Sequence, residues 1–178
     1  REFLSLDLTA RNDWSSTLPK KNNSFFYPSA NLSFVFTDFI REMNWTLPQQ
    51  ITFGKLRLSA AQVGKDPDPY NLYNTRQYQF ANGIRVPIVQ TIKMNSNLKP
   101  EIKTSYEVGL EMKFFNNRLG FDFTYYDTNT YNQLFEYDAP PSTGYKKAYI
   151  NAGKINNWGI EAVVGYKNRW EEFAWSTN

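Results

Sequence analysis

The stretch SYEVGLEMKFFNNRLGFDFTYY, residues 105–126, alternates between apolar and polar side chains with a period of two. Its first half places five apolar residues at every second position, namely Tyr106, Val108, Leu110, Met112 and Phe114. After the turn sequence NNR the alternation resumes, with Leu119, Phe121, Phe123 and Tyr125. Because successive side chains of a β-strand point to opposite faces, this stretch predicts a hairpin with one apolar face and one charged face.

The same alternation marks seven segments of the chain. They cover residues 3–11, 30–37, 54–63, 101–115, 119–129 and 157–168, and a last segment that begins near Phe173. Long polar connections, 12–29, 64–100 and 130–156, alternate with shorter ones such as NNR and NRWEE. One connection expected to be short, 38–53, is an exception because it is longer. Within it, DFIREMNWTLP is compatible with one amphipathic helical turn. This layout predicts an up-and-down antiparallel sheet with its long loops at one end.

Composition excludes several classes of function. The 178 residues include no Cys and no His, which removes disulfides, thiolate metal sites and the commonest metal ligand and acid–base catalyst. A net charge of +3 without a basic run argues against a nucleic-acid partner. Glu107 and Glu111 would lie about 13 Å apart along one strand, beyond the about 5–9.5 Å of glycosidase carboxylate pairs. We therefore predict no enzyme activity, no cofactor and no metal site.

Alternation alone does not distinguish a soluble two-sheet sandwich from a membrane barrel. Most segments, however, exceed the about 5–6 residues of an ordinary strand and match the about 9–11 that cross a bilayer on a tilt. Aromatic residues also lie near the ends of the apolar face: Phe36, Phe114 and Tyr166 toward the short turns, Tyr106 and Trp158 toward the long loops. Both features favour an all-β fold, a partial antiparallel up-and-down transmembrane β-barrel.

This interpretation assigns each face of the sheet by parity. The side chains expected to point outward to lipid are Leu6, Leu8, Phe34, Leu56, Leu58, Leu110, Phe121, Ile160 and Val164. Those expected to point into the lumen are Asp7, Arg57, Glu107, Glu111, Asp122 and Glu161. We expect the charges to pair across strands, Glu107 and Glu111 with Lys55, Lys103 or Lys113.

Four stretches also resemble a known family. They are RNDWSSTLPKKNNSFFYPSANLSFVFT (11–37), FGKLRLSAAQVGKDPDPY (53–70), NLKPEIKTSYEVGLEMKFFNNRLGFDFTYYDTNT (97–130) and INAGKINNWGIEAVVGY (150–166). They are similar to the barrel of the SusC/RagA-like TonB-dependent outer-membrane transporters of Bacteroidota. The run from LKPE to FFNNRL is shared by TonB-dependent receptors broadly, and RNDWSSTLP followed by FYPS and FVFT is more specific to the SusC-like subgroup.

The resemblance implies about seven strands of a 22-stranded barrel in the bacterial outer membrane. It implies an N-terminal plug, a SusD-like surface lipoprotein as partner, contact with TonB through the N-terminal part of the protein, and energy-coupled uptake of oligosaccharides or peptides. We expect residues 1–178 to be an internal segment of that barrel, with the plug domain and the C-terminal strands outside it. Two alternatives remain, a soluble all-β carbohydrate-binding module and a passive outer-membrane porin.

The long loops contain many tyrosines, whose flat faces and polar tips suit wet interfaces and stacking on sugars. The candidate ligand-binding residues are Trp14, Tyr70, Tyr73, Tyr78, Tyr137 and Tyr145, with lumen-facing Arg57 and Glu161 below them. Loops held on a rigid sheet commonly carry function, so we expect ligand or partner contacts at the long-loop end. The competing interpretation is that these rings pack the loops against one another.

Overall fold

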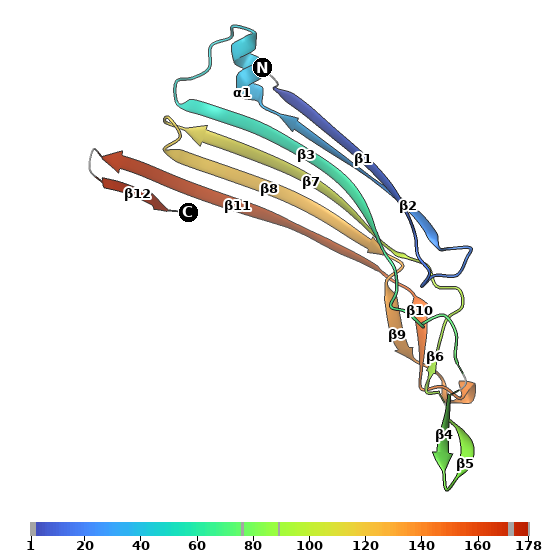
Figure 1. The fold of residues 1–178 in the computed structure, drawn as a ribbon. Helices are drawn as coiled ribbons and strands as arrows, with labels where there is room; N and C mark the ends of the chain where they lie inside the picture. The colour runs from blue at the N-terminus through green and yellow to red at the C-terminus, as the bar shows by residue number, and fades with distance from the viewer. Residues whose placement is uncertain (1–2, 76, 89, 171–172, 178) are drawn as a thin grey trace.

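A single-layer antiparallel sheet of seven strands forms most of the molecule (Figure 1). The computed structural model describes residues 3–75, 77–88, 90–170 and 173–177. The sheet contains β1 (Leu4–Trp14), β2 (Ser24–Phe34), β3 (Ile51–Lys65), β7 (Glu101–Phe114), β8 (Leu119–Tyr131), β11 (Lys154–Trp170) and β12 (Phe173–Thr177). These strands lie side by side in chain order, and the sheet does not close on itself. The seven predicted strands and their sequential order are confirmed.

The second strand begins and ends earlier than its predicted span of 30–37. Phe36 and Thr37 leave the sheet and open helix α1 (Phe36–Glu42), the helical turn expected in this connection. A side chain at Gly54 would come within 2.1 Å of the Phe36 ring, so the glycine makes room for that ring. The buried Thr37 hydroxyl accepts a hydrogen bond from Gly54 N and donates to Gly54 O, replacing the missing strand partner. Among the described residues, no helix is long and apolar enough to cross a membrane.

Five short strands that the alternation did not reveal lie in the long connections. They are β4 (Gln77–Ala81), β5 (Ile84–Ile88), β6 (Ile92–Lys93), β9 (Leu134–Asp138) and β10 (Lys147–Asn151), with the 3-10 helix η1 (Pro141–Thr143) before β10. They form a β4-β5 hairpin and a β6-β10-β9 sheet beyond one end of the large sheet, whereas α1 lies at the opposite end (Figure 1). The first connection shortens to 15–23 because β1 and β2 extend into it. The turn expected in NRWEE includes 171–172, which lie outside the described residues.

The register of the sheet separates its two faces. Residues directly opposite each other in an antiparallel ladder share a face. One row across six strands reads Leu6, Leu32, Leu58, Val108, Tyr125 and Ile160. The adjacent row of opposite parity reads Ser5, Ser33, Arg57, Gly109, Thr124 and Glu161. All nine residues predicted for the apolar face therefore share one face, and the six predicted for the polar face share the other.

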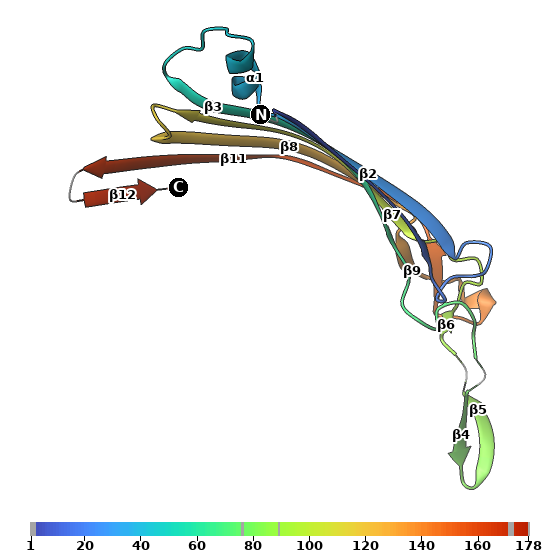
Figure 2. The same cartoon turned by 45° about the horizontal axis from the view of Figure 1, so that its top comes forward.

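In the part of the chain that the structure describes, no second layer covers the apolar face (Figure 2). Leu6, Leu8 and Ile160 keep 58%, 69% and 59% of their surface exposed, which a soluble fold would bury. The buried hydrophobic side chains among the described residues are Leu18, Leu98 and Ala148, all outside the seven-stranded sheet. The two-layer sandwich of a soluble binding module is therefore not the fold of this chain.

Candidate functional site

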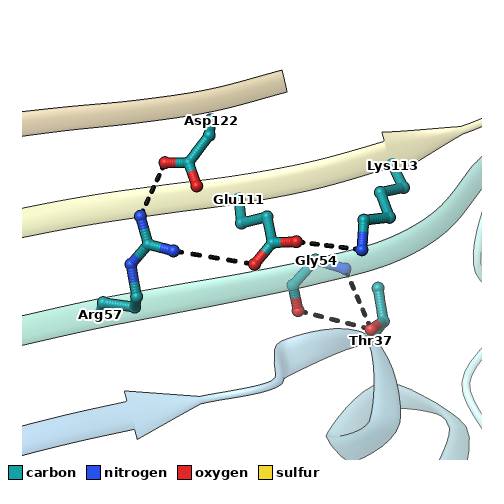
Figure 3. Close-up of polar contacts among 6 residues, drawn as sticks. All are labelled: Thr37, Gly54, Arg57, Glu111, Lys113 and Asp122. Atoms are coloured by element: carbon teal, nitrogen blue, oxygen red, sulfur yellow. Dashed lines mark hydrogen bonds and ion pairs between the residues drawn. The ribbon is translucent and has the colours of Figure 1, made fainter. Parts of the chain in front are cut away.

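The polar face contains a charged network that joins three strands (Figure 3). Arg57 extends from β3 across β7, and its Nη2 donates to Asp122 Oδ1 of β8 at 2.6 Å and to Thr124 Oγ1 at 3.4 Å. Its Nη1 lies 3.7 Å from Glu111 Oε2 of β7. Lys113 Nζ lies 3.0 Å from the other carboxylate oxygen of Glu111, which completes the chain of charges.

Gly109 allows Arg57 to cross β7. The two residues are directly opposite in the register, and Gly109 is buried. A Cβ atom at Gly109 would lie 2.8 Å from Arg57 Nε and 3.0 Å from Nη2. The guanidinium therefore rests against the backbone of β7 and reaches a strand that is not its neighbour. A glycine inside a strand often marks such a close approach, so this glycine could have been singled out in the sequence EVGLE.

Glu111 pairs with Lys113, one of the three predicted lysines, but both residues lie on β7, so this pair does not cross strands. The partner of Glu111 on another strand is Arg57 of β3, which was not predicted. The ion pairs among the described residues include neither Glu107 nor Lys55, although Lys55 lies directly opposite Glu111. Lys55 and Glu107 line a hollow of about 270 Å³ beside Gly109, together with Asn31, Ser33, Ser59 and Thr124. The polar face thus presents charges of both signs, an arrangement suited to binding a polar ligand.

The long-loop end is held together by side chains that bind loop backbone. Asn22 Nδ2 donates to Leu98 O at 2.9 Å, and Asn151 bonds to both the N–H and the carbonyl of Lys99. Asp66 Oδ2 accepts hydrogen bonds from the hydroxyls of Ser15 at 2.5 Å and Thr17 at 3.1 Å. Donation from Ser15 is the largest cause that lowers the pKa of Asp66, with Thr17 adding to it. These contacts fix the loops relative to the ends of the strands.

The six aromatic candidates all lie in or beside the long connections, spread over several segments. Trp14 ends β1 and is 71% exposed, while Tyr70 and Tyr73 are exposed in the loop before β4. Tyr78 lies on β4 with the Arg85 guanidinium 3.9 Å from its ring centre. Tyr137 lies on β9, and Tyr145 is half-buried between η1 and β10. No ring–ring contact between described residues joins any of these six, so the structure does not gather them into one cluster.

The two deeper candidates lie in one row of the polar face. Arg57 belongs to the network, and Glu161 of β11 is exposed opposite Thr124. The prediction did not include Gly109, for which the glycine within EVGLE was the available signal. It also missed a group of polar residues at the long-loop end that come from four separate stretches of sequence, so no local pattern marks them: Lys65, Asp68, Lys99, Glu101, Gln133 and Asn151.

Comparison with known proteins identifies the family. Residues 2–178 match the family model described as TonB dependent receptor-like, beta-barrel. TonB-dependent receptor P3 of Formosa agariphila is 31% identical over 95% of this chain and 17% of its own length. TonB-dependent receptor P26 of the same organism is 26% identical over 97% of this chain and 18% of its own length. The chain thus spans less than a fifth of these curated relatives.

Solved structures share the fold. The RagAB peptide importer in its closed-closed state superposes with a TM-score of 0.84 at 21% identity, over 96% of this chain and 19% of that one. The siderophore receptor PirA from Pseudomonas aeruginosa superposes with a TM-score of 0.62 at 22% identity, over 99% of this chain and 30% of that one. The family match, the sequential sheet and its two separated faces lead to one conclusion: this chain belongs to the TonB-dependent receptor-like β-barrel family.

Proposed function

We propose that this chain is part of an outer-membrane TonB-dependent transporter that imports oligosaccharides or peptides together with a SusD-like surface lipoprotein. The observation that carries the proposal is a single-layer sheet with one uncovered apolar face and one charged face. In an outer-membrane barrel the apolar side of each strand faces lipid and the polar side faces the lumen. Arg57, Glu111, Asp122 and Glu161 then line the lumen.

Two rows of the apolar face support this orientation. Phe114 and Tyr166 flank Leu119 in one row, and Tyr106 and Trp158 flank Asp127 in another. Tyr106 and Phe114, the members of the two rows on β7, are eight positions apart. The rise per residue of a strand places them about 26 Å from each other. A tilt of about 35–45° reduces this to about 20 Å, close to the about 25 Å apolar band between the aromatic girdles of outer-membrane barrels.

The proposal extends to the rest of the parent protein. An open sheet edge is not tolerated in lipid, so β1 and β12 need further strands beside them. We place residues 1–178 as an internal barrel segment, and we assign the plug, the TonB contact and the remaining strands to other parts of a longer protein. The share of the curated relatives that this chain spans, 17–18%, supports that placement.

The partner and the ligand are expected at the long-loop end. The RagAB structures, described as peptide importers or a peptide transporter, support a peptide among the possible substrates. The SusD-like lipoprotein partner is proposed from the resemblance of the sequence to SusC/RagA-like transporters. Trp14, Tyr70, Tyr73, Tyr78, Tyr137 and Tyr145 are the proposed ligand contacts there. Arg57 and Glu161 are proposed to contact the ligand below them.

Uptake by cells that carry the full-length protein tests the function. Deleting its gene should abolish uptake of the cognate oligosaccharide or peptide, and deleting tonB or adding a protonophore should do the same. A SusD-like surface lipoprotein should copurify with the transporter. Uptake that persists without TonB and without a proton gradient would instead indicate a passive porin.

A further inference from the structure

A polar pocket lies where the seven-stranded sheet meets the β6-β10-β9 sheet. Its volume is about 260 Å³, and its lining includes Lys65, Asp68, Lys99, Glu101, Gln133 and Asn151, hereafter the mouth pocket. Lys65 and Glu101 are the last opposed pair of β3 and β7 and lie on the polar face. The pocket therefore opens on the side of the sheet that carries Arg57, at the long-loop end.

The walls of the mouth pocket are fixed by hydrogen bonds. Asn151 Oδ1 accepts from Lys99 N at 2.8 Å, and its Nδ2 donates to Lys99 O at 2.9 Å and to Asn132 O at 2.8 Å. Asp66, which also lines the pocket, is held by the hydroxyls of Ser15 and Thr17. The hydrogen bonds of Asp66 and Asn151 thus hold the pocket in shape. The other polar groups of the lining are left to bind a ligand: Lys65, Asp68, Lys99, Glu101 and Gln133.

The charged groups of Lys65, Asp68, Lys99 and Glu101 form no ion pair with any described residue. The pKa of the Tyr149 hydroxyl is raised first by its hydrogen bond to Glu136, and Asp68 lies near enough to help raise it. Gln133 Oε1 is buried and accepts no hydrogen bond from any described residue. A buried acceptor without a partner is uncommon in proteins and needs a physical explanation, such as a donor supplied by a ligand.

The chemistry of the pocket distinguishes between the two substrate classes. It offers two ammonium groups, two carboxylates and an amide oxygen, whereas no aromatic ring is among its lining residues. A neutral oligosaccharide brings hydroxyls but no charge. A peptide brings ammonium and carboxylate groups that can form ion pairs with the carboxylates and the lysines, besides its amide N–H donors and carbonyl acceptors. Both partners of such a bond carry charge, which a neutral sugar cannot supply.

We propose that the mouth pocket is a peptide-binding site. Ammonium or amide N–H groups of the peptide bind Asp68, Glu101 and Gln133 Oε1, and its carbonyl or carboxylate oxygens bind Lys65 and Lys99. This assignment rests on the proposed function and narrows it to one of its two substrate classes.

The test uses the full-length transporter purified with its lipoprotein. The complex is incubated with a tryptic digest of casein or with a pool of neutral maltodextrins, washed by size exclusion, and its retained ligands are quantified by mass spectrometry. We expect peptides to be retained and the double variant Glu101→Gln/Gln133→Leu to retain at least tenfold less. Glu42→Gln, the same chemical change on α1 at the opposite end, should retain the wild-type amount.

A second variant guards against a folding defect. Gln133→Glu keeps the acceptor and adds a charge, so it should retain more of the peptides that carry a free amino terminus. Retention of maltodextrins alone, retention of neither pool, or unchanged peptide retention in the double variant would overturn the peptide site. The proposed function fails by a separate result, uptake that does not depend on TonB.

Discussion

Arg57 on β3 lies directly opposite Gly109 on β7, and its guanidinium occupies the space that a side chain at Gly109 would need. This single relationship lets one cation bind the carboxylates of Glu111 on β7 and Asp122 on β8. Three strands are thereby linked by side chains as well as by their backbone ladders. The bridge that Arg57 forms depends on the absence of a Cβ atom at Gly109, so substitutions of Gly109 test it directly.

Gly109→Ala should destabilise the barrel by about 1–3 kcal/mol, because the new methyl group overpacks against the guanidinium. Gly120→Ala is the matched control, because Gly120 lies on β8 on the same polar face of the sheet as Gly109. A Cβ atom at Gly120 would meet only Gly165 O, at 3.8 Å. The midpoint of heat-modified migration of the full-length barrel in detergent gels reports the difference. Equal losses for the two variants would mean that Arg57 adjusts freely.

The Arg57–Asp122 pair should contribute only modestly. Both side chains are 37% exposed, so solvent screens the 2.6 Å contact, and a double-mutant cycle with Arg57→Ala and Asp122→Ala should give a coupling of about 0.2–1 kcal/mol. Arg57→Lys should lose most of that coupling, since an ammonium cannot bond to Asp122 and Glu111 in the geometry of the planar guanidinium. A coupling free energy indistinguishable from zero in urea unfolding would mean that the Arg57–Asp122 pair does not contribute to the free energy of unfolding of the barrel.

Leu110→Arg tests the orientation of the two faces. Leu110 lies opposite both Leu56 and Phe123 in the apolar rows, so an arginine there should cost about 2–4 kcal/mol if the position is at the bilayer midplane. Glu107→Arg, three residues earlier on the polar face, should cost much less. Folding yields into lipid vesicles measure both variants. A larger loss for Glu107→Arg would reverse the assignment of the faces.

Acid should loosen the first long connection. The pKa of Asp66 is lowered in the folded chain, first by the Ser15 hydroxyl, so its stabilising effect is complete above the unfolded pKa of about 3.9 and is lost as the pH falls through the lower folded value. Hydrogen exchange, corrected for intrinsic rates, should show residues 15–23 losing protection as the pH falls below about 3.9 and through the lower folded pKa. In Asp66→Asn that pH dependence should vanish. Its persistence would assign the effect to another group.

Tyr73→Ala and Tyr137→Ala should weaken ligand binding by the full-length transporter without lowering the yield of folded barrel. Both rings are exposed at the long-loop end, 64% and 43%, so their removal leaves no cavity in a core. Phe115→Ala removes a ring that is 53% exposed at a short turn and should leave binding unchanged. If binding and growth on the substrate survive both tyrosine changes while the loops stay ordered, these rings are not ligand contacts.

The seven strands, their order and the residues on each face could be predicted from the sequence, because side chains alternate between the faces with a period of two within each strand. Leu110 and Glu111 could be assigned to opposite faces without any structure. The short strands in the long loops were not predicted, although Asn82–Gly83, with φ of 50° and 78°, is a turn signal between β4 and β5.

Which residues meet depends on how the strands pair and the loops pack. The register between β3 and β7 places Arg57 opposite Gly109. A slip of one residue would place Arg57 opposite Val108 or Leu110, which belong to the apolar face. Lys65, Lys99 and Gln133 come together because their three chain segments meet at the same end of the strands, where Asn151 bonds to the backbone of Lys99 and of Asn132 beside Gln133. Alternation within a strand is local, whereas register and loop docking depend on contacts between residues far apart in the chain, and no single stretch of sequence contains them.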